Sequence, residues 1–140
     1  MIVEKELFMT KLNETRKIFI YLPDDYETSN KQYPVLYAFD GHNIFLDAHA
    51  TYGKAIHIQQ HIEKLGIDMI VVGQECSHVG NNRLKEYAPY SFYDPEYGSF
   101  EGQGEETMDF FVHELKPYID DIEPKKQERI HLLVEVAVVV

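Results

Sequence analysis

The stretch Tyr33-Pro34-Val35-Leu36-Tyr37-Ala38-Phe39-Asp40-Gly41-His42-Asn43 decides the fold of this chain. The run from Tyr33 to Phe39 has no charged residue, which is typical of a strand buried on both faces of a parallel sheet. Asp40-Gly41 then ends the run with turn chemistry. Because ligands of open parallel α/β sheets bind at the carboxyl ends of strands, we expect this turn to belong to the functional site.

Strand and helix patterns alternate along the rest of the chain. The expected elements are a strand over 15–22, a helix from about Lys54 to Leu65 ended by Gly66, a buried strand over 67–73, a helix from Glu105 to about Asp121 kinked at Pro117, and a strand over 130–133. This alternation predicts an α/β fold with a mostly parallel sheet and flanking helices.

The segment from Gln74 to Gly104 shows no convincing periodicity and carries six aromatic residues. Loops of this length inside a compact domain are usually functional or mobile. The segment either packs its own aromatic side chains as a small separate core or forms the lid or wall of a ligand pocket.

Composition bounds the class of protein. The 140 residues suffice for one domain, and the net charge of −11 disfavours nucleic acid and anionic membranes as partners. A lone Cys76 excludes an internal disulfide and fits a reducing compartment. We find neither a signal peptide at the N-terminus nor an apolar stretch of membrane-spanning length, so we expect a cytoplasmic protein.

Several segments resemble the "Putative esterase" family of α/β-hydrolases, which includes esterase D, enterochelin-type siderophore esterases and feruloyl esterases. The matching segments cover most of the chain up to about Arg129. They are Arg16–Pro23, Tyr33–Tyr37 leading into Asp40-Gly41-His42-Asn43-Ile44-Phe45, Arg83, Glu86–Pro89, and Phe111–Asp120. The resemblance implies a truncated α/β-hydrolase fold and ester hydrolysis by a Ser–His–Asp triad.

In this family the nucleophilic Ser sits on a Gly-x-Ser-x-Gly elbow directly after the strand expected at 130–133. The chain instead reads Val134-Glu135-Val136-Ala137-Val138-Val139-Val140, so all three triad positions are missing. The resemblance does place one half of the oxyanion hole in the loop at Gly41-His42, through backbone N–H groups. A plain turn is the alternative interpretation of this loop.

The tail is unusual. Read from the third base of each codon, the Val, Ala and Glu codons of 134–140 would encode mainly Gly, Ser, Arg or Cys, which is close to the family's elbow. We therefore divide the chain into 1–129, the N-terminal part of an α/β-hydrolase domain, and 130–140, a divergent hydrophobic tail that a frameshift would explain. A genuine Val-rich strand is the alternative.

Two other groups of residues are weaker candidates for a site. Cys76-Ser77-His78 places a thiol beside an imidazole, but a free Cys is usually a small core residue. His57 and His61 share the spacing of a zinc-protease motif, with His42, His49 and Asp40 as further ligands if the loop folded over, but Ile58 replaces its glutamate. Ser29, Ser77, Ser91 and Ser99 lack the glycines of an elbow. We expect no catalytic residue, metal or cofactor in this chain.

The sequence therefore predicts that the chain derives from a serine carboxylic-ester hydrolase that acts on small or siderophore-type esters. It also predicts that the chain is truncated before the nucleophile and is inactive alone. A non-catalytic binding or interaction protein is the alternative. The complete enzyme would take a small-molecule ester as its partner. A truncated sheet would expose a strand edge, through which we expect self-association.

Overall fold

A computed structural model describes residues 1–122 and 126–134 of the chain. These residues form two compact units. The first unit contains residues 1–6, residues 17–75 and the last strand, and the second contains residues 7–16 and 76–122. Within the described ranges, every helix is too short or too polar to span a bilayer.

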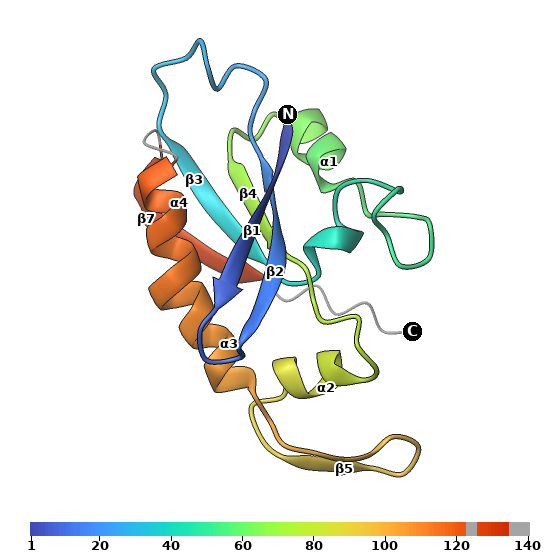
Figure 1. Cartoon of the computed structure of the whole chain (residues 1–140). Helices are drawn as coiled ribbons and strands as arrows, with labels where there is room; N and C mark the ends of the chain where they lie inside the picture. The colour runs from blue at the N-terminus through green and yellow to red at the C-terminus, as the bar shows by residue number, and fades with distance from the viewer. Residues whose placement is uncertain (123–125, 135–140) are drawn as a thin grey trace. The chain divides into compact units, whose positions relative to one another are not determined.

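Five strands form the main sheet, in the order β1-β2-β4-β3-β7 (Figure 1). Their bounds are β1 (Ile2–Met9), β2 (Glu14–Tyr21), β3 (Tyr33–Ala38), β4 (Ile70–Gln74) and β7 (Lys126–Val134). β3 runs parallel to both β4 and β7, whereas β2 runs antiparallel to β4. The predicted α/β fold is confirmed, with a mixed sheet whose three-stranded part β4-β3-β7 is parallel.

β3 is the central strand of this parallel part, and its burial explains its composition. Tyr33 and Val35–Ala38 are all buried, so both faces of the strand are covered. Pro34 lies where the register with β7 shifts, between Tyr33 and Val35. A proline is tolerated there because an irregular position needs no ladder N–H. The predicted doubly buried strand is confirmed.

Helix α1 (Ile58–Leu65) packs on the sheet through Ile62 and the partly buried Ile58, which join a core cluster built from β2, β3, β4 and the segment after β3. Gly66 ends the helix in the left-handed conformation, with φ 65°, as predicted. The expected start near Lys54 is wrong. His57 has φ 57°, which is incompatible with a helix, and the helix begins only after it.

The prediction that residues 74–104 lack regular structure is wrong. They contain the helix α2 (Asn82–Tyr87) and a hairpin of β5 (Phe92–Asp94) and β6 (Gly98–Phe100), visible beside α2 in Figure 1. The rings of Phe92 and Phe100 stack with centroids 5.0 Å apart. Tyr90, Tyr93 and Tyr97 are exposed, so only a fraction of the aromatic side chains forms a small core. The lid or pocket-wall role stays a prediction.

A continuous helical run, α3 (Gly104–Phe110), η2 (Phe111–Leu115) and α4 (Lys116–Ile122), follows the hairpin. Its middle segment η2 is a π-helix that ends just before Pro117. Proline lacks an N–H and its ring crowds the carbonyl of the residue four positions earlier, here His113. The widened π turn therefore lies where the sequence predicts a disturbance of the α-helix.

The sequence predicts the last strand of the sheet but not the first. The sequence pattern predicts no strand before residue 15, yet β1 occupies Ile2–Met9, mostly as an exposed or half-exposed strand. The strand expected at 130–133 is confirmed within β7. The tail at 135–140, with its proposed frameshift, lies outside the described residues.

Candidate functional site

The carboxyl ends of the three parallel strands meet at one edge of the sheet. Ala38, the last residue of β3, pairs with Gly73 of β4 on one side and with Val134, the last residue of β7, on the other. Neighbouring strands lie about 4.8 Å apart. The loop after β3 therefore leaves the sheet beside the carboxyl end of β7. This edge is where ligands of parallel α/β sheets bind.

The loop after β3 is a tight 3₁₀ turn, η1 (Gly41–Asn43). It is entered through Asp40, which is fully buried and has φ 53°, a left-handed conformation that is uncommon outside glycine. The Asn43 N–H donates to the Asp40 carbonyl at 2.8 Å. The predicted turn at Asp40-Gly41 is confirmed, and it is compact and buried.

Gly41 is required by its contact with β4. A Cβ at this position would lie 2.4 Å from the carbonyl carbon and oxygen of Gly73, and a Cβ on Gly73 would lie 2.6 Å from the Gly41 Cα. Real Cβ contacts are essentially never under 3.0 Å. A glycine is therefore required at position 41 by the close approach of two backbones.

Three residues after Gly41 hold the segment that follows the turn in place. The Asn43 side-chain oxygen accepts the Thr51 N–H at 2.9 Å, and the Asn43 carbonyl accepts the Ile56 N–H at 3.0 Å. Phe45 is buried in the core cluster. His42 is also buried, and its Nε2 lies 3.2 Å from the Thr51 Oγ1. Sequence reasoning missed Thr51, because no local pattern connects it to a turn eight residues earlier.

Of the histidines considered as metal ligands, His57 and His49 each contact a carboxylate. His57 is the residue before α1, so it does not share a helical face with the exposed His61 as the spacing predicts. Its Nε2 lies 2.8 Å from the Asp47 Oδ1. The His49 Nε2 lies 3.1 Å from the Glu4 Oε1, and its ring packs on Phe19 at 5.0 Å.

Asp47 explains the late start of α1. Its Oδ1 accepts the Ala55 N–H at 2.7 Å in addition to contacting His57. The Ala55 N–H holds the pKa of the Asp47 carboxyl below its usual range, and the nearby His57 contributes in the same direction. These contacts fix residues 54–57 as a loop although their spacing resembles a helix.

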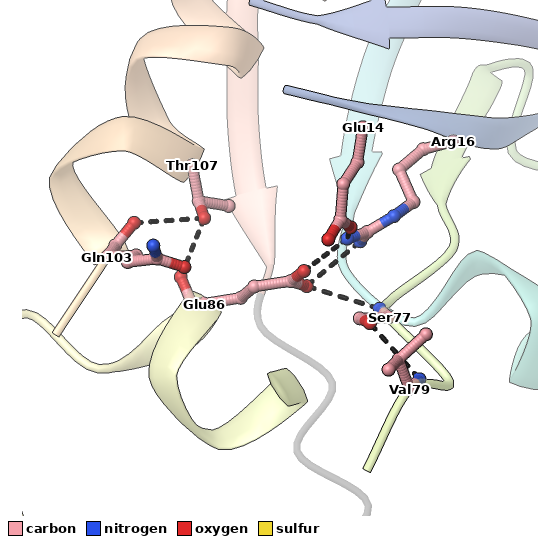
Figure 2. A network of polar contacts seen from close by, with 7 residues as sticks. All are labelled: Glu14, Arg16, Ser77, Val79, Glu86, Gln103 and Thr107. Atoms are coloured by element: carbon pink, nitrogen blue, oxygen red, sulfur yellow. Dashed lines mark hydrogen bonds and ion pairs between the residues drawn. The ribbon is translucent and has the colours of Figure 1, made fainter. Parts of the chain in front are cut away.

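The second unit contains a buried polar network around Glu86, a residue of the family resemblance. Figure 2 shows the Glu86 carboxylate facing Arg16, which donates two hydrogen bonds to it, one of them at 3.0 Å from Nη1. The Ser77 N–H donates to the same carboxylate at 3.2 Å. The Thr107 hydroxyl donates to the Glu86 carbonyl at 2.7 Å, which ties α3 to α2.

Burial by itself lowers the pKa of the Arg16 guanidinium, but the hydrogen bonds to Glu86 and to the more exposed Glu14 outweigh it and raise the pKa overall. Ser77, one of the four serines without the glycines of an elbow, is a structural member of this network. Its Oγ accepts the Val79 N–H at 3.2 Å. Cys76 is buried and His78 exposed.

The parallel strands β4-β3-β7, the antiparallel β2 and the turn after β3 define an α/β-hydrolase-like protein. A solved IroE-like serine hydrolase from Shewanella oneidensis matches 95% of this chain and 42% of its own, with a TM-score of 0.73 and 25% identity. The siderophore hydrolase EstB from Aspergillus nidulans shares the fold, with a TM-score of 0.64 and 17% identity over 96% of this chain and 48% of its own.

The family described as "Putative esterase" matches residues 9–137, and the chain belongs to this family. The uncharacterized protein YjcH of Bacillus subtilis (strain 168) is 31% identical over 125 residues, which are 89% of this chain and 45% of that protein. The chain thus spans about half the length of the relatives it matches. The family resemblance predicted from the sequence is confirmed.

Proposed function

We propose that this chain carries the oxyanion-binding portion of a serine carboxylic-ester hydrolase, with small or siderophore-type esters as the substrates of the complete enzyme. The observation that supports the proposal most is the register of the sheet. Ala38 and Val134 are paired neighbours, so the turn at Gly41-His42 and the position where the family carries its nucleophile follow adjacent strand ends.

The chemistry that this arrangement would perform is stabilisation of a tetrahedral intermediate. When a Ser oxygen attacks the ester carbonyl, negative charge develops on the carbonyl oxygen. A backbone N–H of Gly41 or His42 would donate to that oxygen, and the residue after the nucleophile would supply the second N–H. One such donor is worth roughly 100- to 1,000-fold in kcat.

The 140 residues contain no Gly-x-Ser-x-Gly elbow. We therefore propose that the polypeptide alone does not turn over esters. The test measures hydrolysis of short-chain p-nitrophenyl esters and labelling by a fluorophosphonate, a reagent specific for activated serines. The expected result is background hydrolysis and no label. Labelling that one of the four Ser→Ala variants abolishes would refute the proposed inactivity.

Sequencing the gene through the codons for 130–140 and well beyond them tests the link to a complete esterase. An elbow in another reading frame, followed by Asp and His codons, would support the proposal. A continuous open frame with nothing hydrolase-like downstream would contradict it, and would favour a binding protein.

The oxyanion role itself is tested in the protein that carries the elbow, with two variants of one residue. His42→Pro removes the side chain and the backbone N–H, whereas His42→Ala removes the side chain alone. Proline suits the φ of a 3₁₀ turn, so the backbone should accept it. If the His42 N–H is the donor, His42→Pro lowers kcat roughly 100-fold or more below His42→Ala. Equal kcat values would remove His42 as the donor.

We also propose that the isolated chain self-associates through β7, one of the two edge strands of the described sheet. An edge strand presents N–H and C=O groups that a second copy can pair with. Sedimentation velocity over a hundredfold range of concentration tests this. Species that grow with concentration are expected, and a single monomeric species at every concentration would overturn the proposal.

A further inference from the structure

Thr51 contacts two successive residues of the turn after β3. Its N–H donates to the Asn43 Oδ1 at 2.9 Å, and its Oγ1 lies 3.2 Å from the His42 Nε2. Thr51 lies on the connection between η1 and α1, so these two hydrogen bonds close that connection back onto the turn. One exposed residue therefore holds the side chains of both His42 and Asn43.

The opposite side of the turn is fixed by β4. The backbones of Gly41 and Gly73 are in such close contact that neither tolerates a Cβ. The turn is entered through the left-handed Asp40, a strained conformation that persists only when its surroundings enforce it. The turn is thus held between a rigid strand and the Thr51 contacts.

The connection that carries Thr51 is itself anchored on both sides. Before Thr51, His49 contacts Glu4 of β1 at 3.1 Å. After Thr51, the Ala55 N–H donates to Asp47 at 2.7 Å, and the Ile56 N–H donates to the Asn43 carbonyl at 3.0 Å. Thr51 is consequently a fixed point and not the tip of a free loop, so its hydrogen bonds can transmit position to the turn.

We propose that Thr51 is a positioning residue, whose hydroxyl holds His42 and thereby the backbone N–H groups of the turn in one orientation. Its chemical meaning as part of an oxyanion hole rests on the function proposed above. Donors of this kind act only when held at hydrogen-bond distance from the position the oxyanion will occupy. A residue that fixes their direction would serve catalysis without touching the substrate.

The test uses the 140-residue chain and compares Thr51→Val with Thr51→Ser. Valine keeps the shape and the backbone N–H but deletes the hydroxyl, and serine restores the hydroxyl. Amide hydrogen exchange is followed by NMR at Asn43 and Ile44, whose N–H groups close the turn. The ¹⁵N resonance of the His42 Nε2 reports the side-chain hydrogen bond directly.

Thr51→Val should accelerate exchange at Asn43 and Ile44 about fivefold, the effect of one lost hydrogen bond, and should shift the His42 Nε2 resonance. Thr51→Ser should match the wild type, and exchange at Val71 and Val72 in β4 should not change in either variant. Unchanged exchange in Thr51→Val, or equal acceleration in both variants, would overturn the proposal. Because the test involves no ester, its result does not depend on whether the proposed esterase function is correct.

Discussion

The ion pair between Arg16 and Glu86 provides the sharpest test of the energetics of the second unit. Both side chains are almost fully buried, at 5% and 3% exposure, while the second partner of Arg16, Glu14, is 41% exposed. The two carboxylates thus contact the same guanidinium in very different surroundings. The same substitution, Glu→Gln, at the two positions isolates the effect of burial.

Glu86→Gln removes the charge that compensates the buried guanidinium and weakens three hydrogen bonds, two from Arg16 and one from the Ser77 N–H. Removing one partner of a buried ion pair costs about 3–5 kcal/mol. Glu14→Gln acts on a partly solvated pair, for which less than about 1 kcal/mol is expected. Since domains are stable by only about 5–15 kcal/mol, the first variant should be close to unfolding and the second nearly native.

Urea unfolding, followed by circular dichroism, measures both free energies. The single variant Arg16→Met and the double variant Arg16→Met/Glu86→Gln complete a double-mutant cycle with Glu86→Gln. We expect the double variant to be more stable than Glu86→Gln, because it no longer buries an uncompensated charge. Equal destabilisation by Glu86→Gln and Glu14→Gln, or a cycle without coupling, would refute the reasoning.

Two further predictions concern the first unit. Gly41→Ala should destabilise the fold by about 3 kcal/mol or more, because its Cβ meets the backbone of Gly73. Gly53 has φ 72° and open space around its Cβ, so Gly53→Ala should cost only about 1–2 kcal/mol. Thermal unfolding measures both losses of stability, and similar losses in the two variants would contradict this prediction. Burial and the hydrogen bond to Glu63 raise the pKa of Tyr21 from 10.0 to about 12. The native state then keeps this proton to higher pH than the unfolded state, so the free energy of unfolding should fall between pH 10 and 12, and less steeply in Tyr21→Phe. A slope identical in both proteins would contradict it.

Local chemistry in the sequence predicts much of the first unit. The apolar run of β3 and its end at Asp40-Gly41, the second buried strand and the left-handed cap at Gly66 all depend on residues adjacent in the chain. Such features are readable because burial on both faces demands apolar residues at every position, and turns demand particular backbone conformations. The family resemblance includes the run of β3 and its end at Asp40-Gly41, and the family match over residues 9–137 confirms it.

Tertiary contacts decided what the sequence could not. α1 begins at Ile58 and not near Lys54, because Asp47 binds the Ala55 N–H and His57 adopts a positive φ. Likewise, a glycine is required at position 41 because the backbone of Gly73, a residue of another strand, leaves no room for a Cβ. No periodicity in the sequence predicts such a contact.

The site depends on long-range pairing in the same way. Thr51 reaches the turn across eight residues, and the register of Ala38 with Val134 joins segments almost a hundred residues apart. The sequence determines which residues are present and which local conformations they favour. Only the folded chain determines which of them meet, because hydrogen bonds and close packing between distant segments depend on positions in space and not on neighbours along the chain.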